Sequence, residues 1–133
     1  MKKLPKLKTI RNKCDALLTP IVKKQNPKCL LCPNSTEVAH HHIHKSKSTR
    51  LRYEVENLIN LCNACHLRLH CNESYWASRI VEIKGVEWFK VLDKKKDELV
   101  KADVHFYIQW HEKLTAIYER SEERNPSNGF NNR

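Results

Sequence analysis

Two C-x2-C pairs constrain this chain more than any other feature of its sequence. Cys29 and Cys32 form the first pair, Cys62 and Cys65 form the second, and 29 residues separate the pairs. Each pair can present two thiolates to one tetrahedral ion, and zinc prefers a shell of four cysteines. Four buried thiols without a metal are the alternative. We predict a structural zinc site that joins both ends of this segment.

The composition indicates one small folded domain in a reducing compartment. The chain has 133 residues, of which 40% are apolar, so its core is small and a structural metal would help to stabilise it. No apolar run approaches the roughly 18 residues of a membrane span, and the basic N-terminus lacks the apolar stretch of a signal peptide. We therefore expect a cytoplasmic protein without membrane association, in which Cys14 and Cys71 are packed thiols rather than disulfide partners.

Positive charge is concentrated at the N-terminal end. Residues 1–28 hold nine Lys and Arg against one Asp, residues 29–71 hold five against three acidic residues, and residues 72–133 hold eleven of each sign. A one-sided basic arm is typical of proteins that bind a polyanion, most often nucleic acid. A solubilising basic tail is the alternative that composition alone leaves open.

Hydrophobic periodicity predicts an α+β fold. The expected elements are a helix over 8–24 that Pro20 kinks or splits, strands over 36–43 and 57–61, a helix from about residue 62, a helix from an Asn72 cap to Gly85, and helices over 86–101 and 105–122. The predicted parts are a basic N-terminal arm over 1–28, a metal-binding core over 29–72, C-terminal helices over 73–122 and a flexible tail over 123–133.

Six of the eight histidines lie close to the cysteine pairs. His66 and His70 are four apart at the start of a predicted helix, which puts both imidazoles on one face. Neighbours on a strand point to opposite sides, so only one of His41 and His42 can join them. The even-numbered histidines of this segment share the direction opposite to that of His41; they are His40, His42 and His44. Three protein ligands with an open position are typical of a catalytic metal site, so we predict a second, open site.

The order of these residues resembles the HNH, or ββα-metal, endonucleases. The shared pattern is a doublet ending in His, then an Asn, then C-x2-C-H-x3-H, which here comprises His41, His42, Asn57, Cys62, Cys65, His66 and His70. The resemblance implies a small zinc-stabilised, treble-clef-like ββα-metal core with flanking helices. It also implies that His41, His66 and His70 hold a catalytic divalent ion. By the same resemblance His42 is the general base, and Asn57 steadies the loop that carries it.

Two further likenesses concern the wider chain. The zinc-knuckle branch of these enzymes, which includes phage endonuclease VII, has a His two residues after the base, as His44 stands here, and has Asn in place of His66. More loosely, the basic helix before CLLC, the LRYEVENL segment and EIKG are similar to the phage NinG/Rap family of recombination nucleases. These likenesses imply a DNA partner, a bacterial or phage-infected cell, and branched or recombination-intermediate DNA as one candidate substrate.

One metal ion and one neutral imidazole are a sufficient apparatus for phosphodiester hydrolysis. The ion stabilises charge on the leaving oxygen, and an imidazole with a pKa of about 6.5 can take a proton from water. The resemblance implies Mg²⁺ or Mn²⁺, and an imidazole shell is also compatible with Zn²⁺ or Ni²⁺. We expect DNA phosphates to be held by the basic residues of the intervening loop, Lys45, Lys47, Arg50 and Arg52.

Two alternatives from other functional classes remain open at this point. A non-catalytic zinc module that binds nucleic acid would explain the cysteines and the basic arm, and a structural zinc domain that binds a protein partner would explain the cysteines alone. Neither explains the histidine doublet in register with Asn57, His66 and His70. The appended helices are compatible with a homodimer, an expectation that rests on analogy.

Overall fold

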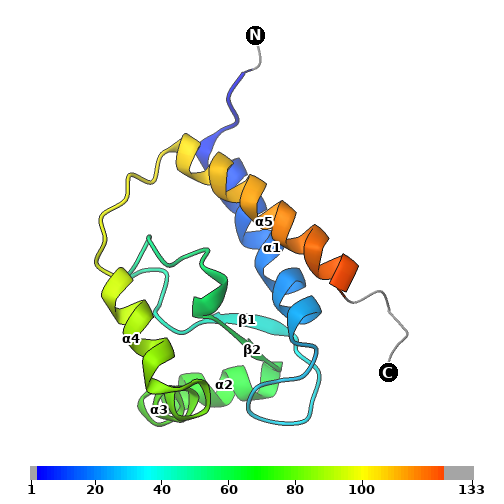
Figure 1. Cartoon of the computed structure of the whole chain (residues 1–133), viewed down its shortest axis with the longest axis vertical. Coiled ribbons are helices and arrows are strands. Elements are labelled where there is room, and N and C mark those ends of the chain that lie inside the picture. Colours follow the sequence, from blue (N-terminus) through cyan, green and yellow to red (C-terminus); the bar gives the residue numbers. More distant parts are fainter. Residues whose placement is uncertain (1–2, 125–133) are drawn as a thin grey trace.

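The structure, a computed structural model, describes residues 3–124 and has a mixed α+β architecture (Figure 1). Its elements in chain order are α1 (Leu7–Gln25), β1 (Val38–His41), the short 3-10 helix η1 (Val55–Asn57), β2 (Leu58–Leu61), α2 (Asn63–Cys71), α3 (Glu73–Lys84), α4 (Val86–Lys95) and α5 (Val104–Arg124). Within the described residues, five α-helices thus accompany one two-stranded sheet. The predicted α+β class is confirmed.

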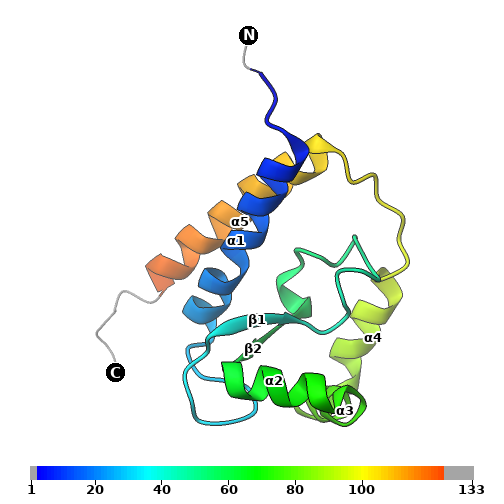
Figure 2. The ribbon, with the colours of Figure 1, turned by 180° about the vertical axis from the view of Figure 1, so that it is seen from behind.

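Helices α1 and α5 lie side by side and run in the same direction (Figures 1 and 2). The Cys14 thiol lies 3.2 Å from the carbonyl oxygen of Tyr107, and Gln25 Nε2 lies 3.5 Å from Ser121 Oγ near the other end of the pair. Pro20 does not split α1, contrary to one of our expectations. The neighbouring side chain of Ile21 is buried in the α1–α5 core, so packing holds the helix together where a backbone hydrogen bond is missing.

The sheet divides the molecule into two apolar cores. Strands β1 and β2 are antiparallel, and residues directly opposite each other share a face. Val38 pairs with Leu61, and both belong to the core that surrounds the cysteine pairs and α2. On the other face, Ala39 and Leu58 belong to the α1–α5 core. The alternation of side chains along β1 therefore decides which histidine faces α2 and which faces α1.

Helices α3 and α4 follow α2 and meet at a corner, with a single residue between them (Figure 1). Gly85 joins them with a φ of 102°, a conformation that favours glycine, and it follows α3 as the sequence predicts. Asn72 is the N-cap residue of α3 as expected, but its side chain makes no cap hydrogen bond. The expected end of α4 near residue 101 is wrong, because α4 ends at Lys95. The chain after α4 instead crosses to α5, and Glu98 on this crossing binds Arg50 at 2.9 Å.

The predicted C-terminal tail can be compared with the structure only in part. Most of the expected tail, residues 125–133, lies outside the described residues, and Glu123 and Arg124 belong to α5. The predicted strands at 36–43 and 57–61 are shorter, and Asn57 lies in η1 rather than in β2. None of the helices in residues 3–124 is both long and apolar enough to cross a membrane.

Candidate metal centres

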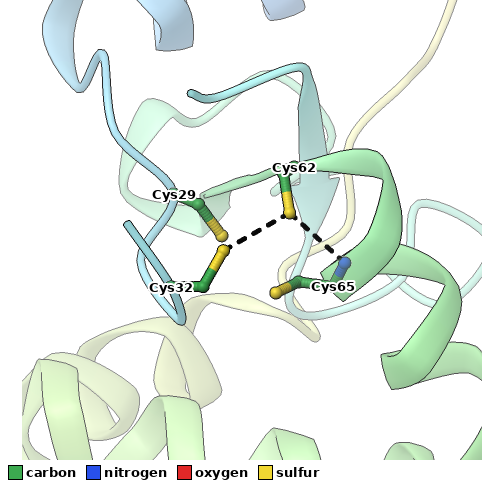
Figure 3. Close-up of side chains that lie close together, drawn as sticks. All are labelled: Cys29, Cys32, Cys62 and Cys65. Atoms are coloured by element: carbon green, nitrogen blue, oxygen red, sulfur yellow. Dashed lines mark hydrogen bonds between the residues drawn. The ribbon is translucent and has the colours of Figure 1, made fainter. Parts of the chain in front are cut away.

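The four paired cysteines converge on one point (Figure 3). Cys29 and Cys32 come from the loop after α1, Cys62 is the N-cap of α2, and Cys65 lies in its first turn. All four sulfur atoms lie within 4.8 Å of one another, and Cys32 Sγ is 3.6 Å from Cys62 Sγ. A zinc ion with Zn–S distances of about 2.3 Å would place its sulfur ligands about 3.8 Å apart. The cluster could therefore bind a metal such as zinc.

Backbone amides favour the thiolate forms that a metal requires. The N–H of Leu31 lies 3.4 Å from Cys29 Sγ, and the N–H of Cys65 lies 3.4 Å from Cys62 Sγ. The second of these bonds lowers the pKa of the Cys62 thiol to about 6. All six cysteines are free thiols, including the buried Cys14, whereas Cys71 is exposed and is not the packed thiol that we expected.

Three imidazoles form a second candidate metal centre between β1 and α2. His40 on β1 meets His66 and His70 on α2, and one ring nitrogen from each lies within 4.8 Å of the others. The Nε2 atoms of His66 and His70 are 3.1 Å apart. Two nitrogens bound to one ion at about 2.1 Å would lie roughly 3.0–3.4 Å apart, so this spacing fits shared ligation. The donor set leaves room for further ligands, as an open site requires.

The three histidines reach from the interior to the surface. His40 is only 6% exposed, His66 is half-buried and His70 is exposed. Burial, reinforced by the neighbouring imidazoles, lowers the pKa of His40 to about 3, and burial also lowers the pKa of His66. Both groups are therefore neutral near pH 7, which is the form of imidazole that binds a metal.

The β1 residue that meets His66 and His70 is His40 and not His41. In the sheet His40 pairs with Ile59, which faces α2, whereas His41 pairs with Leu58, which faces the α1–α5 core. Successive side chains of β1 point to opposite sides, as predicted, and the side that faces α2 carries His40. The resemblance to the HNH doublet implies His41 as the β1 ligand, one residue after the histidine that meets α2.

His41 instead binds the backbone of the loop that follows β1. Its Nε2 lies 2.8 Å from the carbonyl oxygen of Arg52. Because a carbonyl oxygen only accepts, Nε2 carries the proton and Nδ1 keeps its lone pair. Burial lowers the pKa of His41, and the bond to Arg52 opposes that shift. The side chain is thus a neutral imidazole with a defined tautomer, as a general base requires.

His42, the residue expected to be the base, packs against α4. Its ring centroid lies 4.9 Å from that of Trp88 and 5.7 Å from that of Phe89. Trp88 Nε1 in turn donates a 2.8 Å hydrogen bond to the carbonyl oxygen of Glu56. Burial lowers the pKa of His42. These contacts give His42 a packing role between α4 and the residues before β2. We expected His42 instead to be a general base beside the metal.

Asn57 joins the two ends of the loop between the strands. Its Oδ1 accepts from the N–H of Ile43 at 2.8 Å, and its Nδ2 donates to the carbonyl oxygens of Ile43 at 2.9 Å and Leu51 at 3.4 Å. Leu51 is the residue before Arg52, whose carbonyl binds His41. The buried amide therefore has the geometry of a brace for the loop that orients His41.

The four basic loop residues fall into two groups. Arg50 binds Glu54 at 3.1 Å and Glu98 at 2.9 Å, and Arg52 binds Asp15 on α1 at 2.8 Å. Lys45 and Lys47 are exposed. The two arginines, which the sequence favoured as phosphate contacts, are thus engaged with carboxylates, and the two lysines have their ammonium groups at the surface.

His44 lies at the outer side of the three-histidine centre. Its ring centroid is 6.1 Å from that of His40, and its Nε2 binds the carboxylate of Glu73 at the start of α3. Neither His40 as a candidate ligand nor Glu73 as a neighbour of His44 was predicted from the sequence. The strand alternation could have indicated His40 once its facing side was known, but no sequence signal connects Glu73 to His44, 29 residues away.

Comparisons of the chain with protein-family models, with curated proteins and with solved structures found no match to any of them. The function of the protein is therefore inferred from the geometry of its two candidate metal centres.

Proposed function

We propose that this protein is a metal-dependent endonuclease of the HNH type that hydrolyses phosphodiester bonds in DNA. The observation that carries the proposal is the arrangement of two adjacent residues of β1. His40 converges with His66 and His70 on one side of the strand, and His41 on the other side has its tautomer set by the Arg52 carbonyl. A three-nitrogen cation site and a neutral imidazole base thus come from neighbouring positions.

The proposed roles shift by one residue from those that the family resemblance implies. His40, rather than His41, would hold the ion with His66 and His70, and His41, rather than His42, would act as the base. Asn57 keeps its role as the brace of the loop. His44 is not assigned a proton-transfer role, because its Nε2 is occupied by Glu73.

The proposed reaction uses these residues in the following way. A divalent ion, when bound, supplies positive charge that stabilises the scissile phosphate and the leaving 3′ oxygen. His41 Nδ1 accepts a proton from the attacking water as its oxygen bonds to phosphorus. The bond from phosphorus to the 3′ oxygen breaks, and that oxygen takes a proton from solvent. The Arg52 carbonyl stabilises the imidazolium that forms on His41, because it accepts from the protonated Nε2.

The donor set favours a transition metal over Mg²⁺. Mg²⁺ prefers oxygen ligands. Imidazole nitrogens bind Ni²⁺ and Zn²⁺ best, Mn²⁺ less well and Mg²⁺ least well. All three side chains of the centre are imidazoles. We therefore include Mn²⁺, Ni²⁺ and Zn²⁺ in the proposal as candidate ions, and a zinc ion in the four-cysteine cluster as the structural metal.

A DNA partner is supported by charge. Residues 1–28 carry a large excess of Lys and Arg, and Lys45 and Lys47 present exposed cations on the loop that follows the centre. Cations placed in this way suit contacts to a phosphate backbone. Branched DNA remains one candidate substrate, which a comparison of supercoiled, linear and four-way-junction DNA would test.

A plasmid-nicking assay tests the proposed activity. Zinc-loaded protein is incubated with supercoiled DNA and Mg²⁺, Mn²⁺, Ni²⁺ or Zn²⁺ in turn, and with a chelator too weak to remove the structural metal. We expect nicking with at least one ion and loss of nicking in His66→Ala. His105→Ala is the matched control, because His105 is exposed on α5. Protein that binds DNA but never nicks it would favour the non-catalytic zinc module.

A further inference from the structure

Glu73 brings a negative charge to a metal centre whose ligands have none. The three imidazoles of His40, His66 and His70 are neutral ligands, so a divalent ion among them would keep its full charge. Glu73 begins α3, immediately after α2 carries His66 and His70. A carboxylate in the first turn of a helix is favourable in itself, so its position alone would not require a function.

The contacts of Glu73 point away from a purely local role. Its carboxylate binds Nε2 of His44, which comes from the loop after β1. The edge of the His44 ring in turn faces His40. The hydrogen bond to His44 lowers the pKa of Glu73, so the group is ionised near pH 7. The carboxylate is thus held by a side chain whose ring lies against the candidate ligand His40.

We propose that Glu73, held by His44, is a positioning residue of the three-histidine centre that raises its affinity for a divalent cation through charge. The inference rests on the proposed function, because it concerns the same centre. Glu73 would not be a direct ligand, since the group of converging ligand atoms comprises only the three histidines among the described residues.

The same charge has an opposite effect on DNA. Without a cation, an ionised Glu73 beside the centre repels the phosphate that would approach it. When a cation is bound, the net charge of the centre becomes positive, and the repulsion is overcome. The proposal therefore gives a double signature for Glu73→Gln, which keeps the size of the side chain. Cation affinity falls, and DNA affinity in the absence of cation rises.

The test uses the full chain with zinc in the cysteine cluster. Mn²⁺ binding is measured from the electron paramagnetic resonance signal of the free ion, and metal-free DNA binding is measured by fluorescence anisotropy. We expect Glu73→Gln to bind Mn²⁺ severalfold more weakly than wild type, because a nearby negative charge is lost. Glu82→Gln is the matched control, because it removes the same charge from an exposed position on the same helix. It should change neither measurement.

Further variants separate the failure of this inference from the failure of the proposed function. His44→Gln should weaken Mn²⁺ binding by less than Glu73→Gln, because the carboxylate loses its anchor but not its charge. The inference is overturned if wild type and Glu73→Gln bind Mn²⁺ with equal affinity while His66→Ala abolishes that binding. This result would leave the endonuclease proposal standing. Wild-type protein that binds no Mn²⁺, Ni²⁺ or Zn²⁺ beyond the cysteine cluster would overturn both.

Discussion

Asn57 and Ile43 form a reciprocal pair of hydrogen bonds across the loop between the strands. The N–H of Ile43 donates to Oδ1 of Asn57 at 2.8 Å, and Nδ2 of Asn57 donates back to the carbonyl oxygen of Ile43 at 2.9 Å. The Asn57 side chain is fully buried. The pair fixes the segment just after His41 relative to the start of β2.

Asn57→Ala should therefore destabilise the fold and slow cleavage together. The change leaves buried partners on Ile43 and Leu51 without their hydrogen bonds, which costs about 2–4 kcal/mol of unfolding free energy. Urea unfolding monitored by tryptophan fluorescence measures this loss. Asn12→Ala, at an exposed position on α1, is the control and should leave stability unchanged. Wild-type stability in Asn57→Ala would contradict the brace.

The cysteine cluster should contribute much of the stability of the chain. A bound zinc in a site of this type contributes on the order of 10 kcal/mol in small modules. Cys62→Ser removes the thiolate that the Cys65 amide stabilises, so it should lower the melting temperature strongly and release zinc. Mass spectrometry of the intact native protein counts the metal. Cys71→Ser changes an exposed thiol outside the cluster and should behave like wild type; equal melting of the two variants would refute the assignment.

The two exposed lysines of the loop should supply DNA affinity. Replacing Lys45 and Lys47 together by Ala should weaken binding to duplex DNA and make the dependence of log affinity on log salt shallower by about 1.8. The double variant of Lys90 and Lys94 on α4 removes the same charge from another exposed surface. Binding titrations at several salt concentrations compare the two. An unchanged salt slope in the loop variant would place the DNA contacts elsewhere.

Arg52 should behave differently from these lysines. Its guanidinium binds both carboxylate oxygens of Asp15, at 3.2 and 2.8 Å, and is mostly buried. Arg52→Met should thus lower the unfolding free energy by about 1–2 kcal/mol, since the pair is only partly shielded from solvent. The salt slope for DNA binding should not change. A stable Arg52→Met protein with a shallower slope would instead restore the phosphate contact expected from the sequence.

The residues of the two candidate metal centres could be predicted from the sequence better than the contacts that they make. The spacing of Cys29, Cys32, Cys62 and Cys65 was sufficient to predict the cluster, because two C-x2-C turns have few other ways to use four thiols. The spacing of His66 and His70 was also sufficient to place both rings on one helix face, because helical periodicity is a local property.

The choice among the β1 histidines could not be made from the sequence in the same way. Which side of the strand faces α2 depends on the register with β2, a tertiary relationship that places His40 opposite Ile59. The contacts of Arg52 with Asp15 and of Glu73 with His44 also join segments far apart in the chain. No local pattern encodes such pairs, so the carboxylate partners of Arg52 and His44 could not be predicted from the sequence.

The most direct test of the proposed function compares two adjacent histidines. His41→Gln keeps a side-chain donor that can reach the Arg52 carbonyl but removes the proton acceptor, whereas His42→Gln changes the neighbour that packs against Trp88. The measurement is the single-turnover rate of plasmid nicking at saturating DNA and divalent ion. We predict a loss of about 10²–10⁴-fold in His41→Gln and much less in His42→Gln. Full activity in His41→Gln, with the rate lost in His42→Gln, would contradict the account.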